Sequence, residues 1–320
     1  MPASPPAKSL SSTTSGRNPV PRVLLYGIDL ENLDTKARAT LHSYLTDAER
    51  HEAATYALET GRSRFEAFRG ALRAILAREL GLAPQEVPIV RTKSGKPVLA
   101  AHERPNAVPS PAVAFNLSHC GDLGLVAVAR LVAVARPAVG LRGTSGAAAQ
   151  VYDGTHDTAA TALISVGVDL ETVRPMPGAR HIVEDFFHPE EAAYLDGILA
   201  GEHGTAASPE DGAGTPAQAS SRPEPGAPNY ESAFFGLWTQ KEAIIKCAGG
   251  EVLPSLRSFS ALESTGGILG TRDTFVVNVT EYMEAAGLPE GVFAALAVTP
   301  PVAPEIHALR FGVDLLKTPT

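Results

Sequence analysis

The segment VGVDLE, at residues 166–171, predicts a β-strand that carries two acidic side chains. Because strand side chains alternate between faces, Asp169 and Glu171 point to one face while Val168 and Leu170 point to the other. Two neighbouring carboxylates repel each other unless their face is solvated or holds a cation. The pair therefore indicates either a strand end that reaches solvent or half of a cation site.

A second segment, WTQKEAIIK at residues 238–246, has the pattern of a helix. Glu242 and Lys246 are four residues apart, so a helix places them on one face with the glutamate nearer the N-terminus. Ile244 and Ile245 can anchor this helix in a core. Such Glu–Lys pairs are common on helix surfaces, so this pair alone does not separate a solvated pair from a functional one.

Together, Asp169, Glu171, Glu242 and Lys246 predict a site for a hard divalent cation. Mg²⁺ prefers a few carboxylate oxygens, retained waters and the phosphate oxygens of a substrate. Lys246 would bring positive charge to the same phosphates. The sequence contains neither a P-loop nor a glycine-rich dinucleotide fingerprint, so the standard nucleotide-binding folds are not indicated.

Outward from these two segments, the chain has the order strand, helices, strands, linker, strand, helices, strands. Apolar residues predict an opening strand at residues 20–30, and apolar spacings of three and four predict a helix that ends at Gly81. Further helices are expected at 182–199 and 230–248. This α+β pattern occurs twice, so we expect two lobes with a site between them.

The expected division of the chain follows from shifts in composition. It comprises a disordered tail at 1–19, an N-terminal lobe at 20–130, an insertion or linker at 131–161, and a C-terminal lobe at 162–320 that contains a disordered loop at 201–229.

Composition and charge narrow the class of protein. The 320 residues are 44% hydrophobic and 19% charged, which is typical of a globular protein. The formal net charge of -8 argues against a nucleic-acid binder, which usually has a basic face. The cysteines, Cys120 and Cys247, form no metal-ligand or disulfide pattern, which fits a reducing compartment and a cytoplasmic protein.

One apolar stretch, at residues 123–141, is long enough to cross a membrane. It contains Arg130 and Arg136, and each arginine near a bilayer centre would cost about 2.5–3.5 kcal/mol. We therefore expect a buried strand at 123–129 that runs into a linker, and no association with a membrane.

Four motifs in a fixed order resemble those of the Sfp-type 4′-phosphopantetheinyl transferases. They are GKP at 95–97, FNLSHCGD at 115–122, GVDLE at 167–171 and WTQKEAIIK at 238–246. The arginine-rich segment 62–73 and the segment FFHPEEAAYL at 186–195 are also similar to parts of that family. The resemblance implies a pseudo-twofold fold of two similar lobes, each a small, mainly antiparallel sheet packed with helices, with the active site between the lobes.

The resemblance also implies roles for individual residues. Asp169, Glu171 and Glu242 would hold Mg²⁺, with Glu171, Lys246 and Glu242 as the catalytic groups. The residues implied to bind coenzyme A are Arg64, Gly95, Lys96, Pro97, Ser118, His119 and Lys246. For His119 the alternative is a turn histidine that is satisfied by backbone groups.

The implied reaction moves the 4′-phosphopantetheine arm of coenzyme A onto a serine of an acyl or peptidyl carrier protein. It depends on Mg²⁺ and releases adenosine 3′,5′-bisphosphate. Glu171, directly or through a metal-bound water, is the candidate base for the serine proton. The protein is expected to act as a monomer. The alternatives are a Mg²⁺-dependent hydrolase of nucleotide pyrophosphates and a non-catalytic homologue that only binds carrier proteins.

Overall fold

The computed structural model describes residues 21–100, 113–130, 164–201, 229–249, 256–262, 268–269, 274–299 and 303–316. The expected tail at 1–19 and insertion at 131–161 lie outside these residues, and so does the loop expected at 201–229 apart from its two end residues.

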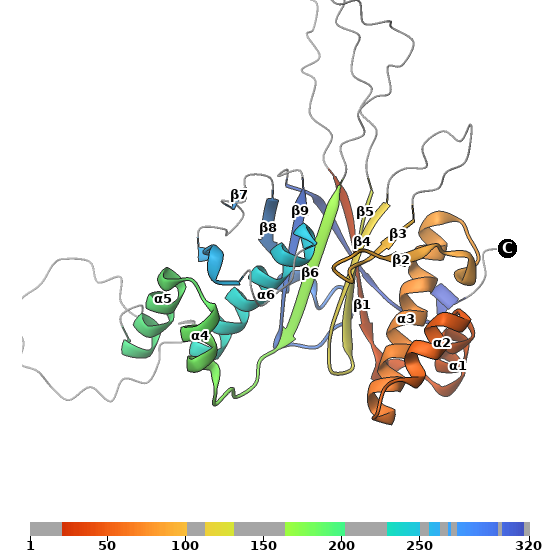
Figure 1. Ribbon diagram of the computed structural model, residues 1–320, viewed down its shortest axis with the longest axis horizontal. Coiled ribbons are helices and arrows are strands. Elements are labelled where there is room, and N and C mark those ends of the chain that lie inside the picture. The colour runs from red at the N-terminus through yellow and green to blue at the C-terminus, as the bar shows by residue number, and fades with distance from the viewer. Residues whose placement is uncertain are drawn as a thin grey trace, which may run out of the picture.

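The first of two open four-stranded sheets has the strand order β10-β1-β5-β4 (Figure 1). Its strands are β1 Arg22–Asp29, β4 Val113–Cys120, β5 Leu123–Arg130 and β10 Glu305–Arg310. β1 pairs antiparallel with β5 and parallel with β10, so the last strand of the chain joins the sheet that contains the first. The expected lobe ranges, 20–130 and 162–320, remain a prediction for the chain as a whole.

The second sheet has the order β6-β9-β8-β7, with every neighbouring pair antiparallel. Its strands are β6 Ser165–Thr172, β7 Ile268–Leu269, β8 Thr274–Asn278 and β9 Val292–Thr299. A separate antiparallel hairpin consists of β2 Ile89–Arg91 and β3 Pro97–Leu99.

Helices lie on the two outer sides of this pair of sheets, α1 to α3 beside the first sheet and α4 to α6 beside the second (Figure 1). The α-helices are α1 Thr35–Ser43, α2 Asp47–Ala54, α3 Glu59–Leu80, α4 Ala179–Phe186, α5 Pro189–Ala200 and α6 Tyr230–Ala248. Short 3₁₀ turns are η1 Leu30–Asn32, η2 Pro84–Glu86, η3 Leu256–Ser258, η5 Thr280–Tyr282 and η6 Val313–Leu316. The fold is α+β with two lobes, as the sequence predicted.

The core has a layer on each side of each sheet. One face of the first sheet packs on α3, where Phe68 and Leu72 belong to the same buried core as Tyr26 of β1. The other face of that sheet and the inner face of the second share a core, to which Leu25 and Val168 belong. The two lobes are therefore joined by buried apolar surface.

Local chemistry accounts for two helix ends, and the one at Gly81 was predicted from the sequence. Thr46 and Glu49 form a reciprocal capping box at the start of α2. Gly81 follows α3 in the left-handed conformation, at φ 67°, where glycine carries no steric penalty.

The single helix expected at 182–199 is two helices, α4 and α5. Pro189 begins α5 as its first residue, and the residue before a proline is disfavoured in helical conformation. His188 is accordingly extended, with φ −64° and ψ 146°, and caps the new helix. Pro189 thus marks the point at which the expected single helix divides into α4 and α5.

Among the residues described, no helix combines the length and apolar character needed to cross a bilayer. The expected strand at 123–129 is present as β5, at the centre of the first sheet.

Candidate functional site

A close approach between helix α6 and strand β6 brings the two acidic motifs together. Gly167 of β6 faces α6, and a Cβ built on it would lie 2.1 Å from the carbonyl oxygen of Ala243 and 2.4 Å from the amide nitrogen of Cys247. Only glycine leaves room for the helix at this distance. As a result Glu242 and Lys246, one turn apart on α6, lie beside Asp169 of β6.

The ammonium of Lys246 is the centre of this cluster. Its Nζ lies 2.5 Å from Oδ1 of Asp169 and 3.1 Å from Oε2 of Glu242. It also donates to Oγ of Ser118 at 3.1 Å, while the Ser118 hydroxyl donates to the same oxygen of Asp169 at 2.7 Å. Two acids, a lysine and a serine from three separate segments therefore form one network.

Burial and charge set the electrostatics of this network. Burial raises the pKa of Asp169 to about 7, opposed by Lys246 and assisted by the charge of Glu242. For Lys246, burial alone would lower the pKa, but the carboxylates of Asp169 and Glu242 outweigh it and raise the pKa. Oδ2 of Asp169 is buried and has no hydrogen-bond partner in the described part of the chain. An unpaired carboxylate oxygen of this kind is a natural ligand for a cation.

Glu171 shares its strand face with Asp169 but has a different partner. Arg174 donates to its Oε2 at 2.9 Å, and the guanidinium of Arg174 lies over the ring of Phe235 at 5.0 Å. No three acidic, histidine or cysteine side chains of the described residues surround one point that could hold a metal. The assignment of Asp169, Glu171 and Glu242 as metal ligands therefore remains a prediction, with Lys246 now between two of them.

Side chains join the two sheets along their edges, next to this network. β4 and β6 are edge strands of different sheets and run beside each other. Oδ1 of Asn116 accepts the backbone N–H of Val168 at 2.9 Å, and Ser118 reaches Asp169 one step further along β4. Asn116 and Ser118 point to the same side of β4 because strand side chains alternate. Asn116 lies in the motif FNLSHCGD, but the sequence alone did not suggest a role for it.

His119 and Arg64 lie near the same end of β4, on the side of α3. The imidazole of His119 stacks on the ring of Phe68, with centroids 4.9 Å apart and planes 6° apart. Partial burial, and then the positive charges of Lys246 and Arg64, lower the pKa of His119. Arg64 donates from Nε and Nη2 to both oxygens of Asp122, at 2.9 and 2.8 Å. Asp122 lies in the motif that was recognised in the sequence, but its pairing with Arg64 was not predicted.

Lys96 lies in the turn of the β2–β3 hairpin, where Gly95 adopts a positive φ of 82°. Its ammonium is directed at protein oxygens of the second lobe, 2.5 Å from the carbonyl of Lys246 and 3.2 Å from that of Cys247. The structure therefore brings Lys96 to α6, but by contacts that the sequence did not predict.

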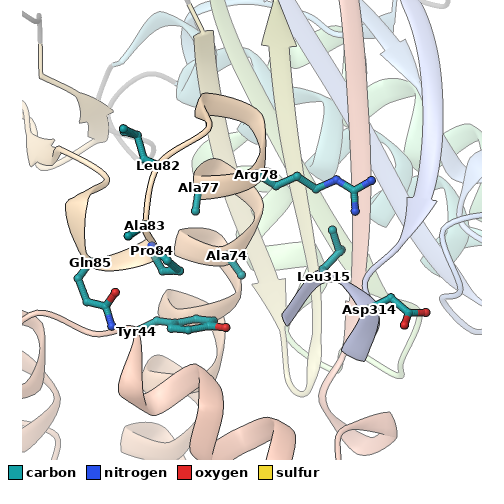
Figure 2. Close-up of a pocket in the computed structure, with 10 residues that line it drawn as sticks. All are labelled: Tyr44, Ala74, Ala77, Arg78, Leu82, Ala83, Pro84, Gln85, Asp314 and Leu315. Atoms are coloured by element: carbon teal, nitrogen blue, oxygen red, sulfur yellow. The ribbon is translucent and has the colours of Figure 1, made fainter. Parts of the chain in front are cut away.

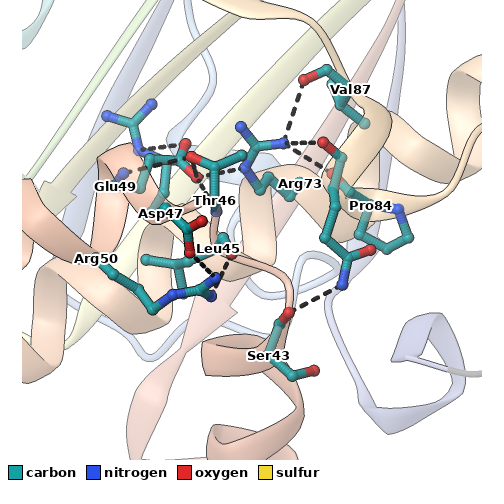
Figure 3. Close-up of polar contacts among 11 residues, drawn as sticks. Ser43, Leu45, Thr46, Asp47, Glu49, Arg50, Arg73, Pro84 and Val87 are labelled. Carbon is teal, nitrogen blue, oxygen red and sulfur yellow. Dashed lines mark hydrogen bonds and ion pairs between the residues drawn. The ribbon is translucent and has the colours of Figure 1, made fainter.

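Arg69 and Arg73 of α3 have structural partners. Arg73 is buried, donates to Glu49 at 2.6 Å and also bonds the carbonyls of Pro84 and Val87 (Figure 3). Arg69 lies 3.7 Å from the same glutamate. Arg73 thus holds α2, α3 and η2 together and is occupied by these contacts.

A cavity of about 390 Å³ lies apart from the cluster. It is bounded by α3, the segment after it and the turn η6, with Tyr44, Pro84 and Leu315 among its lining residues (Figure 2). None of the sequence-predicted site residues lines it.

Two family models match the chain, one for each half. The model described as 4′-phosphopantetheinyl transferase superfamily matches residues 165–281, and the model described as 4′-phosphopantetheinyl transferase, N-terminal, matches residues 35–131. The first range contains β6 and α6, and the second contains α3, the β2–β3 hairpin and β4.

Three similar proteins carry related names. A putative 4′-phosphopantetheinyl transferase of Synechocystis sp. is 27% identical over 205 residues, which are 64% of this chain and 57% of that protein. The 4′-phosphopantetheinyl transferase HetI of Nostoc sp. is 25% identical over 227 residues, 71% of this chain and 68% of its own. A phosphopantetheinyl transferase of Thraustochytrium sp. is 36% identical over 86 residues, 27% of each chain. The match thus spans less than two thirds of the Synechocystis protein.

Proposed function

The chain belongs to the 4′-phosphopantetheinyl transferase superfamily, and we propose from this that it transfers the 4′-phosphopantetheine arm of coenzyme A to a serine of an apo-carrier protein. The serine oxygen forms a bond to the β-phosphorus of coenzyme A, the bond from that phosphorus to the bridging oxygen breaks, and adenosine 3′,5′-bisphosphate leaves. The observation that carries the proposal is the network of Asp169, Ser118, Glu242 and Lys246 at the meeting of the two lobes.

We propose that Asp169, Glu171 and Glu242 hold Mg²⁺. The buried oxygen Oδ2 of Asp169 supports this, since a carboxylate oxygen without a donor is costly to bury unless a cation meets it. Glu242 supplies a second carboxylate within reach of the same ammonium. When bound, the ion would neutralise negative charge on the pyrophosphate of coenzyme A.

Lys246 is proposed to stabilise the departing phosphate. Its ammonium is held by the carboxylates of Asp169 and Glu242, which fix its orientation beside the acids. A pyrophosphate that took over this ammonium from Asp169 would leave the Asp169 carboxylate free to bind a cation. Glu171 is the proposed acceptor of the serine proton, being half-buried at the strand end beside Arg174.

Coenzyme A is proposed to lie across the edges of the two lobes. His119 and Arg64 are proposed to contact the phosphates of its nucleotide, with Ser118 as a further contact. Gly95 and Pro97, in the hairpin turn, are proposed to line the nucleotide pocket, while the ammonium of Lys96 between them is directed at α6.

The proposed partners are acyl or peptidyl carrier domains of the fatty-acid, polyketide, nonribosomal-peptide or aminoadipate-reductase type. We further propose a monomer that acts in the cytoplasm, where the free thiols of Cys120 and Cys247 stay reduced.

Mass spectrometry of one apo-carrier of each type, after incubation with the protein, coenzyme A and Mg²⁺, tests the proposal. A carrier that gains the mass of phosphopantetheine is the expected result, and the carriers that react give the specificity. Consumption of coenzyme A without carrier would favour the pyrophosphate hydrolase instead, and carrier binding without transfer would favour the non-catalytic homologue.

The variant Asp169→Asn tests the acid cluster itself. It keeps the shape of the side chain and removes its charge, so transfer should fall by about a hundredfold or more. The variant should stay folded, because Lys246 keeps its ion pair with Glu242, and the thermal unfolding midpoint checks this. Asp185→Asn, at an exposed position on α4, is the matched control and should retain full transfer. Wild-type transfer by Asp169→Asn would exclude this carboxylate from the reaction.

A further inference from the structure

The turn of the β2–β3 hairpin presents Lys96 on a well-defined backbone. Thr92 and Lys96 exchange backbone and side-chain bonds, with the Thr92 amide donating to the Lys96 carbonyl at 2.9 Å and the Lys96 amide donating to the Thr92 hydroxyl at 3.1 Å. The amide of Gly95 donates to the carbonyl of Thr92 at 2.9 Å, and Gly95 supplies the positive φ that closes the turn. The stem of Lys96 therefore starts from a fixed point in the first lobe.

The ammonium of Lys96 ends in the second lobe, among four oxygens. Two are the carbonyls of Lys246 and Cys247 in the last turn of α6, at 2.5 and 3.2 Å. The other two belong to the start of β6, the carbonyl of Val166 at 3.2 Å and the hydroxyl of Ser165 at 3.3 Å. A lysine has three N–H donors, so these oxygens use its full capacity.

The last turn of a helix is a favourable place for a cation. Its final carbonyls lack partners further along the helix, and the helix dipole concentrates negative charge there. Lys96 donates to two carbonyls of α6 from outside the helix, in addition to the Gly249 amide at Lys246 and the Ser165 hydroxyl at Cys247, and at the same time binds the strand on which α6 packs. One side chain thus ties the C-terminal end of α6 to the start of β6 and to the first lobe.

We propose that Lys96 is a positioning residue that holds the end of α6, and through it the side chain of Lys246, in place against Asp169. The inference rests on the proposed function, and it gives the lysine of the hairpin a role other than contact with the nucleotide. The link is short, because Lys246 accepts a bond from Lys96 at its carbonyl and makes its own bond to Asp169 with its ammonium. An ammonium with every donor engaged cannot bind a phosphate unless it gives up one of these bonds.

The variant Lys96→Met tests the proposal, because methionine keeps an apolar stem and removes the ammonium. Lys93→Met is the matched control, since it removes the same charge from the same turn at an exposed position. Three quantities are measured for both variants: kcat for transfer, KM for coenzyme A, and hydrogen–deuterium exchange of residues 238–249 without coenzyme A.

Lys96→Met should lower kcat by about tenfold or more, since small misplacements of a reacting group cost up to about a hundredfold. Its KM for coenzyme A should stay close to that of the wild type, and exchange at the end of α6 should rise before any ligand is added. Lys93→Met should leave all three unchanged. Lys96→Arg, which restores donors to the helix end, should recover most of the exchange protection, and it carries the test if the methionine variant does not fold.

A large rise in KM with unchanged kcat and unchanged exchange would overturn the proposal and make Lys96 a nucleotide contact. Effects equal to those of Lys93→Met would also overturn it. Failure of the wild-type protein to modify any carrier would refute the proposed function, whereas the exchange data would still decide whether Lys96 holds α6.

Discussion

Substitution of Gly167 by alanine tests whether the close approach of α6 to β6 builds the site. The added Cβ would lie 2.1 Å from the carbonyl oxygen of Ala243 and 2.4 Å from the amide nitrogen of Cys247. Ordinary van der Waals contact begins at 3.4 Å, and both obstacles are backbone atoms that no rotamer change can move. The helix as a whole must therefore retreat from the strand by roughly 1 Å.

Two costs follow from this displacement. Overpacking of a well-packed interior costs about 1–3 kcal/mol, which should appear as a lower free energy of unfolding. In addition, α6 carries Glu242 and Lys246, and a shift of about 1 Å in reacting groups can reduce a rate by about a hundredfold. We expect the loss of transfer to exceed what the loss of folded protein explains.

Gly236→Ala is the control, because it makes the same chemical change within α6. A Cβ at that position would lie 3.8 Å from the ring of Phe293, which is ordinary contact. Replacing glycine by alanine inside a helix is worth about 0.5–1 kcal/mol, so this variant should be as stable as the wild type or more stable. Its transfer activity should be unchanged.

Urea titration gives the free energy of unfolding of each variant. Transfer to an apo-carrier is measured without urea, at a temperature at which both variants remain folded. If Gly167→Ala transfers phosphopantetheine within twofold of the wild type while it remains folded, the approach of helix to strand does not set the catalytic geometry. If Gly236→Ala is equally inactive, the effect belongs to α6 in general and not to its contact with β6.

Two further results are expected. Lys241→Met should lower the free energy of unfolding by about 3–5 kcal/mol in urea titrations. The fully buried Lys241 and Glu191 form an ion pair at 2.7 Å, and the methionine would leave the carboxylate without its counter-charge. A loss below about 1 kcal/mol would contradict this. The pKa of His119, followed by NMR, should lie below its ordinary value of about 6.5 in the free protein. The unfolded chain then takes up this proton first as pH falls below 6.5, so His119 contributes a loss of stability towards acid pH. Coenzyme A phosphates should raise that pKa, and no change on saturation would remove His119 from the ligand site.

Short-range patterns in the sequence predicted the parts of the fold that depend on neighbouring residues. The alternation in VGVDLE correctly placed Val168 and Leu170 in the core, with Asp169 and Glu171 on the other face of β6. The cap at Thr46 and the stop at Gly81 follow from the same kind of local chemistry.

Partners far apart in the sequence were not predictable. The Glu242–Lys246 pair resembles a surface pair, yet its ammonium is held between Asp169 and Ser118, which come from two other strands. Lys96 resembles a turn lysine that is free to meet a ligand, yet its donors are used by α6 and β6. Burial decides these roles, and burial depends on how the lobes pack.

The four sequence motifs lie on elements of both lobes that contact one another. Each motif alone is therefore a weak indication of the site, while the four together are a strong one. β4 and β6 are edge strands that are joined by the side chains of Asn116 and Ser118. The residue types at these positions are therefore set by the hydrogen bonds they make between the sheets and not by strand propensity. β10 returns to the first sheet, and the inner faces of both sheets share a core, so neither lobe has a complete interior without the other. Asp169 receives Ser118 from the first lobe and Lys246 from the second, and its surroundings therefore depend on both lobes. A fragment that carried only the second lobe would keep the sequence GVDLE but lose the hydroxyl and the hairpin lysine that hold its surroundings in place.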